Sequence, residues 1–152
     1  MRGEEKPMQL RLELDGINVT LAINNYTKLH RSEYGCTWCT VDYSFKDEPW
    51  LCYEKRNAEI LTAEEVDFLT AKLKELLDGQ IDETVRVDFI EPDFQFELYR
   101  CENEVCLDWK IYFWHPQKGL TGNYLSVLLC RSEIEEFWKF LIGVQQNFKE
   151  KR

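Results

Sequence analysis

The sequence has no long hydrophobic run and none of the motifs that mark a catalytic or phosphate-binding loop. No apolar stretch approaches the roughly 20 residues needed to span a bilayer, so we expect no membrane-spanning segment. A glycine-rich phosphate loop, a GxSxG elbow and an HExxH helix are also absent from the sequence. The two histidines, His30 and His115, belong to no recognised motif with a nucleophile. We therefore assign no catalytic and no cofactor-binding residue.

Basic residues are fewer than acidic ones. The 19 lysines and arginines face 28 aspartates and glutamates, which gives a formal net charge of -9. An acidic surface repels phosphates and gains nothing from counterion release, so we expect no direct binding of nucleic acid. Residues 1–7 lack the charged-then-apolar layout of a signal peptide, which favours a cytoplasmic location.

The composition is that of a folded chain, with 44% hydrophobic and 14% aromatic residues. At 152 residues one hydrophobic core can form, so we predict a single globular domain over residues 1–152.

The first half alternates apolar and polar residues and then changes to a helical period. Residues 10–14 and 19–23 alternate around the turn Asp15-Gly16, which predicts a hairpin. A longer strand is expected over 39–45 and a short one over 58–61. Thr62-Ala63-Glu64-Glu65 has the form of a capping box, and the apolar positions that follow it predict a helix that ends at Asp78-Gly79.

The same order of elements recurs in the second half. Val85, Val87 and Phe89 stand 75 positions after Leu10, Leu12 and Leu14. Further strands are expected over 107–113 and 125–129, and Ser132-Glu133-Ile134-Glu135 predicts a second capping box. We interpret residues 8–79 and 83–149 as an internal pseudo-repeat, each half having the order β-β-β-β-α.

This order predicts an α+β fold in which the strands form a curved antiparallel sheet with two helices packed on one face. The apolar stripes of both helices need a common surface to cover. Val41, Tyr43, Ile111 and Phe113 are expected to be buried beneath the helices.

The six cysteines do not predict a metal site. Cys36 and Cys39 have CxxC spacing, but residues three apart on a strand point to opposite faces and could not converge on one zinc ion. We expect no bound metal and no cofactor, and we expect the thiols to be free and mostly buried.

The strand phase that buries Trp109 and Ile111 turns their neighbours to the opposite face of the sheet. Acidic residues alternate there with large aromatic residues, a mixture typical of protein interfaces. An equally open alternative is that a second layer, loops or a dimer partner cover these aromatic residues. The predicted partner-binding residues are Trp38, Asp42, Glu97, Tyr99, Asp108, Tyr112 and Trp114. Both a monomer and a homodimer stay open.

Four segments together resemble the WapI-like immunity proteins. They are Trp38-Cys39-Thr40-Val41-Asp42-Tyr43-Ser44-Phe45, Leu61-Thr62-Ala63-Glu64-Glu65-Val66 with the leucines that follow it, Phe89-Ile90-Glu91-Pro92-Asp93-Phe94-Gln95-Phe96, and Trp109-Lys110-Ile111-Tyr112-Phe113. Within the third segment, Glu91-Pro92-Asp93 is better interpreted as a hairpin turn than as a contact site.

The resemblance covers nearly the whole chain and implies a small bacterial cytosolic protein, encoded beside a polymorphic contact-dependent toxin. Such a protein binds and neutralises its cognate toxin domain without catalysis. A nuclease toxin with a basic surface would suit the acidic charge of this chain. Two other hypotheses stay open on the sequence alone: a regulatory or small-ligand binding module, and an enzyme with a dispersed site.

Overall fold

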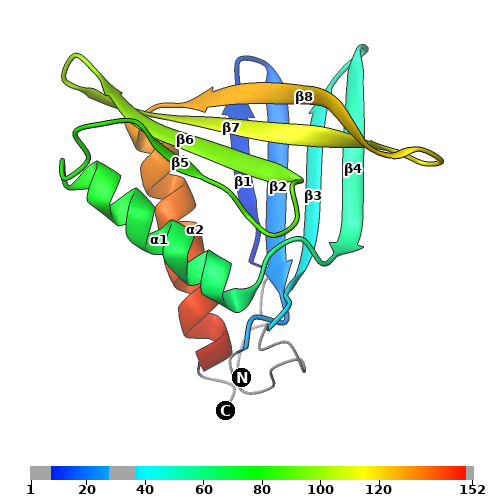
Figure 1. The fold of residues 1–152 in the computed structure, drawn as a ribbon, viewed down its shortest axis with the longest axis horizontal. Helices are drawn as coiled ribbons and strands as arrows, with labels where there is room; N and C mark the ends of the chain where they lie inside the picture. The colour runs from blue at the N-terminus through cyan, green and yellow to red at the C-terminus, as the bar shows by residue number, and fades with distance from the viewer. Residues whose placement is uncertain (1–7, 28–36, 150–152) are drawn as a thin grey trace, which may run out of the picture.

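The computed structural model describes residues 8–27 and 37–149, which form eight strands and two helices (Figure 1). The first half contains β1 (Leu10–Leu14), β2 (Ile17–Asn24), β3 (Thr40–Asp47), β4 (Leu51–Ala58) and α1 (Ala63–Leu77). The second half contains β5 (Val85–Val87), β6 (Phe94–Cys101), β7 (Glu104–His115), β8 (Gly119–Leu129) and α2 (Arg131–Lys149).

The strands form two antiparallel sheets of four, in the orders β1-β2-β3-β4 and β5-β6-β7-β8. The α+β class and the ββββα order of each half are therefore confirmed. In place of the one curved sheet that we predicted, two sheets cross one another, with both helices beside them (Figure 1). Within the described part of the chain, no strand of β1–β4 pairs with a strand of β5–β8, so the two sheets pack against one another through their side chains.

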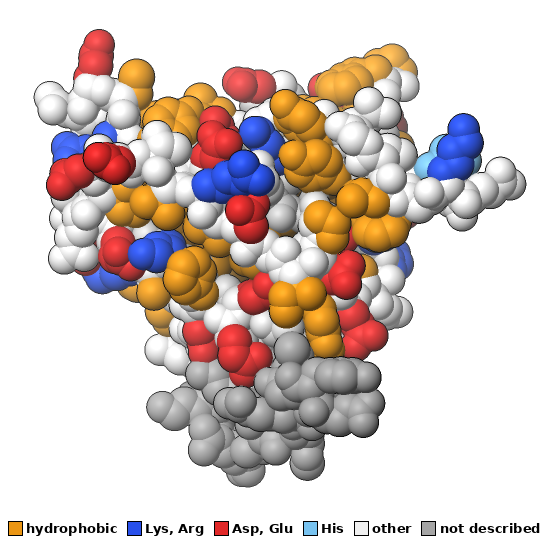
Figure 2. All heavy atoms as spheres, in the orientation of Figure 1, with side chains coloured by type: hydrophobic (Ala, Val, Ile, Leu, Met, Phe, Trp, Pro, Cys, Tyr) orange, Lys and Arg blue, Asp and Glu red, His pale blue; other side chains and the backbone are white. Residues whose placement is uncertain are grey.

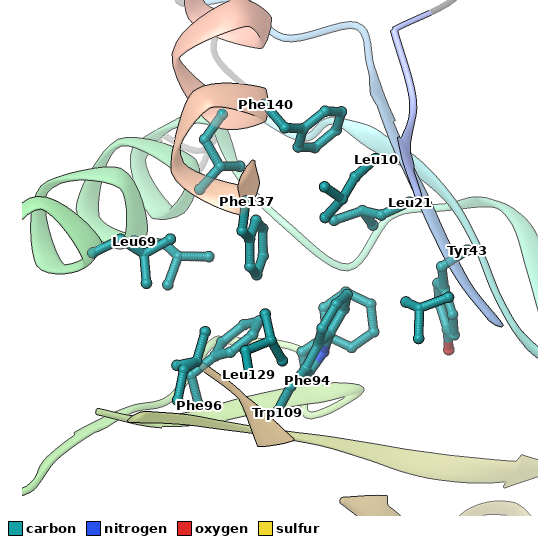
Figure 3. Close-up of a cluster of buried hydrophobic side chains, with 14 of the residues drawn as sticks. Leu10, Leu21, Tyr43, Leu69, Phe94, Phe96, Trp109, Leu129, Phe137 and Phe140 are labelled. Atoms are coloured by element: carbon teal, nitrogen blue, oxygen red, sulfur yellow. The ribbon is translucent and has the colours of Figure 1, made fainter. Parts of the chain in front are cut away.

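Both sheets and both helices contribute side chains to one hydrophobic core (Figure 3). Aromatic rings of the two sheets contact one another directly. The ring centroids of Tyr43 and Phe94 are 4.9 Å apart and those of Phe45 and Trp109 are 5.3 Å apart, and both pairs pack edge to face. Phe137 of α2 stacks on Trp109 at 5.3 Å. The inner face of the second sheet is thus shared between α2 and the first sheet.

The predicted burial holds at Val41, Tyr43 and Ile111 and fails at Phe113, which is only half-buried. A register shift between Tyr112 and Trp114 of β7 disturbs the alternation of faces at this point. Tyr43 lies against the second sheet and not beneath the helices as predicted.

The prediction of a short strand over 58–61 is wrong, because the fourth strand, β4, covers Leu51–Ala58. Along β4, half-buried Leu51, Tyr53 and Lys55 alternate with exposed residues. Because Lys55 takes one of the inward positions, the hydrophobicity of the residues along β4 does not show this alternation. The predicted strand over 125–129 is real but begins at Gly119.

The capping box at Thr62 is confirmed. The Thr62 hydroxyl accepts the Glu65 N–H at 3.1 Å, and the Glu65 carboxylate accepts the Thr62 N–H at 3.0 Å. The second oxygen of Glu65 accepts the backbone N–H of Ile90 at 2.8 Å, so the same side chain ties the two halves together. The box predicted at Ser132 is wrong: α2 begins at Arg131, and the Cys130 N–H donates to Glu133 Oε1 at 2.8 Å.

Removing the hydroxyl of the first cap gives a testable prediction. Thr62→Ala should lower the free energy of unfolding by about 1–2 kcal/mol, because the Glu65 N–H then loses its acceptor at a buried position. Thr62→Ser retains the hydroxyl and should lose less. Ser132→Ala, at an exposed position inside α2, should change stability by less than about 0.5 kcal/mol. Urea unfolding followed by circular dichroism measures all three, and equal losses for Thr62→Ala and Ser132→Ala would contradict the assignment.

Candidate partner-binding surface

Four of the predicted contact residues come together on the outer face of the second sheet. Glu97 lies directly opposite Asp108, and Tyr99 lies opposite Cys106, in the ladder between β6 and β7. Tyr112 follows on the same face of β7, opposite Tyr124 of β8. We call this surface the acidic-aromatic face. It consists of Glu97, Tyr99, Asp108, Lys110, Tyr112, Tyr124 and Leu128.

Polar contacts connect these side chains in two groups. The Tyr99 hydroxyl donates to Asp108 Oδ1 at 3.1 Å. Lys110 Nζ lies 3.3 Å from Glu97 Oε1 and 5.3 Å from the ring centroid of Tyr124. The rings of Tyr112 and Tyr124 are 5.1 Å apart. The side chains of the face therefore contact one another.

The protonation states on this face follow from the same contacts. Burial, reinforced by the charge of Asp108, raises the pKa of Tyr99 to about 12, so its phenol remains a hydrogen-bond donor at neutral pH. The hydrogen bond to Glu97 raises the pKa of Lys110, so its ammonium remains charged. The face thus presents two carboxylates, one ammonium and several phenols, with the exposed Arg86 at its edge, opposite Glu97 and paired with Asp88.

The sequence reasoning missed the contribution of β8. Tyr124 and Leu128 are 49% and 44% exposed, while Val127 and Leu129 between and beside them are buried. This period-two alternation is the available signal, but the strand predicted over 125–129 is too short to include Tyr124. Hydrophobic groups also lie among charged ones on the face toward the viewer in Figure 2.

Trp38 and Asp42 lie elsewhere, so the prediction that they share one face with the other residues is wrong. Asp42 belongs to β3 in the first sheet, where Oδ1 accepts the backbone N–H of Asn57 at 2.7 Å. Trp38 forms an isolated bridge with Thr62 next to the start of α1. The alternation rule places residues on the same side only within one sheet, and the two sheets have different outer faces.

Trp114 also leaves the acidic-aromatic face. Beyond the β7 irregularity its backbone N–H donates to Tyr53 Oη at 3.0 Å, and Lys55 Nζ lies 4.5 Å from its ring centroid. Both partners belong to β4, and the indole nitrogen is buried. For this residue the structure agrees with the alternative of a covered aromatic side chain.

The cysteines are less buried than predicted. Cys39 and Cys106 are buried, whereas Cys52, Cys101 and Cys130 are exposed, so the expectation of mostly buried thiols is wrong for the described residues. Cys36 of the CxxC pair lies outside the described residues. Within residues 8–27 and 37–149, no cluster of three His, Cys, Asp or Glu side chains could hold a metal ion. None of the helices in these ranges has the length and hydrophobicity to cross a membrane.

These environments predict different reactivities for the thiols. Burial and the nearby carboxylate of Glu64 raise the pKa of Cys39 to about 12, so its reactive thiolate is scarce. Iodoacetamide at pH 8 should modify Cys52, Cys101 and Cys130 in the folded protein and leave Cys39 protected until guanidinium is added. Peptide mass spectrometry after timed quenching measures this. Labelling of Cys39 as fast as Cys52 in the folded state would contradict the burial.

The family comparison agrees with the resemblance seen in the sequence. The chain matches the model of the immunity protein WapI-like family over residues 10–148. The matched span runs from the first residue of β1 to the last turn of α2. A comparison with curated proteins found no match.

Proposed function

Because the chain belongs to the WapI-like immunity protein family, we propose that it binds a cognate bacterial toxin domain and neutralises it by direct protein–protein contact. The match over residues 10–148 is the observation that carries this proposal. Binding alone blocks the toxin, so the protein needs neither catalysis nor a cofactor. It would act in the cytoplasm, as part of a polymorphic toxin system with contact-dependent inhibition, and as a monomer or a homodimer.

The acidic-aromatic face is our proposed contact surface. It combines the exposed Tyr124 and the half-buried Tyr99 and Tyr112 with carboxylates that can meet basic groups, and tyrosines are favoured anchors at protein interfaces. The net charge of -9 would increase the rate of association with a basic toxin such as a nuclease. Glu97, Tyr99, Asp108 and Tyr112 are retained as contact residues in this proposal, with Tyr124 and Leu128 added.

Co-expression with the toxin domain encoded immediately upstream tests the proposal. The two purified proteins should form a complex with a Kd in the nanomolar range, which corresponds to a binding free energy of about −12 kcal/mol at 1 nM. Isothermal titration calorimetry measures this Kd. Cells that express the toxin domain should survive only when they also make this protein. A toxin domain from an unrelated system is the control and should not bind. Survival of toxin-expressing cells without this protein, or failure of the purified pair to associate, would overturn the proposal and favour a regulatory or small-ligand binding module.

A further inference from the structure

We propose that Asp108, held in place by Tyr99, is the docking site for an arginine side chain of the partner. This inference rests on the proposed function and makes it more specific, because it names the chemical group that the acidic-aromatic face recognises. Three observations carry it: the charge pairing across β6 and β7, the hydrogen bond of Tyr99, and the position of Lys110.

The first observation is that two carboxylates oppose one another and that the neighbouring Lys110 pairs with only one of them. Glu97 and Asp108 are directly paired in the ladder, an arrangement of like charges that is unfavourable in a sheet. Lys110 offsets the charge of Glu97 through an ion pair of 3.3 Å. Asp108 forms no ion pair within the described part of the chain. Its charge is therefore left for a cation from another molecule.

The second observation is the orientation of Asp108. Its Oδ1 atom accepts the Tyr99 hydroxyl at 3.1 Å, which holds the carboxylate in place. At neutral pH the Tyr99 phenol is protonated, since its pKa ordinarily lies well above that pH and is raised further here, so it acts as a donor and not as a competing anion. A carboxylate held in this way loses little conformational freedom when a guanidinium binds it.

The third observation is that a cation already lies beside an aromatic ring on this face. Lys110 Nζ is 5.3 Å from the centroid of Tyr124, whose ring contacts Tyr112. An incoming guanidinium is planar and can donate two hydrogen bonds to the Asp108 carboxylate, which an ammonium cannot do in the same geometry. These features favour arginine over lysine.

Exposed apolar groups beside the site suit the rest of the arginine side chain and its neighbours. Leu128, which is 44% exposed, lies directly opposite Asp108 in the ladder between β7 and β8, and the half-buried ring of Tyr99 flanks Asp108 on β6. Such groups exclude water from the ion pair when a partner covers them, which strengthens it.

The test compares two variants that remove the same charge, with titration calorimetry against the purified toxin domain at 50 and 300 mM NaCl. Asp108→Asn should weaken binding by at least about tenfold at low salt and should reduce the salt dependence of Kd. Glu104→Gln removes an exposed charge at the start of β7 and should weaken binding less than about threefold. Equal melting temperatures of both variants, checked by circular dichroism, ensure that folding is not the cause.

Substitution of each toxin arginine by alanine then identifies the bound group. One of these substitutions should add no further loss in the Asp108→Asn background, since the pair is already broken. If the unaltered protein binds and Asp108→Asn behaves like Glu104→Gln, or if no arginine shows this coupling, the docking site is wrong while the proposed function stands. Failure of the unaltered protein to bind would overturn both.

Discussion

Replacement of Trp109 by alanine should lower the free energy of unfolding by about 3–5 kcal/mol, the largest loss we expect from one core side chain. Trp109 is 0% exposed, and its ring contacts come from three parts of the fold. Phe45 lies 5.3 Å away in the first sheet, Phe96 lies 5.4 Å away in the second, and Phe137 of α2 stacks on it at 5.3 Å. The indole therefore fills the space where the two sheets and α2 meet, and alanine would leave a cavity there.

Trp109→Phe is the matched control. It keeps an aromatic ring at the same position and removes an indole N–H that is buried without a hydrogen-bond partner among the described residues. Removal of this N–H breaks no hydrogen bond, so we expect Trp109→Phe to lower the free energy of unfolding by less than half as much as Trp109→Ala. Urea unfolding monitored by circular dichroism measures both variants. A loss below about 1.5 kcal/mol for Trp109→Ala would show that the surrounding rings close the cavity, contrary to our expectation.

Period-two alternation predicted most of the core because a strand with one buried face must place its apolar residues two apart. Leu10, Leu12 and Leu14 of β1 are all buried, as are Leu107, Trp109 and Ile111 of β7. The same rule says which face of a strand is buried and not what lies against it. Whether an edge strand of one half pairs with an edge strand of the other decides between one sheet and two, and alternation carries no information about such pairing, so the division into two sheets was not predictable from the pattern.

The candidate surface was predictable to a similar extent. Alternation placed Glu97, Tyr99, Asp108 and Tyr112 together because they belong to neighbouring strands of one sheet. It failed for Trp114 because the irregularity after Tyr112 changes the direction of the following side chains. Lys55 and Asp93 were missed because a charged side chain that points inward gives no hydrophobic signal. Only the fold shows that these two groups meet.

Asp93 and Lys55 form an ion pair between the second half of the chain and the first. Asp93, in the turn before β6, has a side chain that is 1% exposed, and its Oδ2 atom lies 2.9 Å from Lys55 Nζ of β4. The buried Tyr43 hydroxyl donates to the same oxygen at 3.0 Å. Burial, together with the Asp93 charge, raises the pKa of the Tyr43 phenol, which therefore stays a donor. The segment 91–93 is the turn that we predicted, but Asp93 also has this structural role.

Removal of Lys55 should lower the free energy of unfolding more than neutralisation of Asp93. Lys55→Met would leave the Asp93 carboxylate buried without a cation, and Oδ1 has no hydrogen-bond partner among the described residues. We expect a loss of about 3–5 kcal/mol in the free energy of unfolding. Asp93→Asn would leave the ammonium of Lys55, which is 28% exposed and can be solvated, and an amide oxygen could still accept from Tyr43. We expect a loss of about 1–2 kcal/mol for that variant.

The double variant separates the ion pair from other effects of the substitutions. Once Asp93 is replaced by the neutral Asn, the Lys55→Met substitution no longer creates a buried uncompensated charge, so the double variant should be more stable than Lys55→Met alone. Urea unfolding of the four proteins gives the coupling energy of the cycle directly. Two results would contradict this expectation: a loss of unfolding free energy for Lys55→Met no larger than that for Asp93→Asn, or losses of the two single variants that simply add in the double variant. Either result would mean that water reaches the Asp93 carboxylate in the folded protein. The ion pair would then contribute little to the contact between the two halves of the chain.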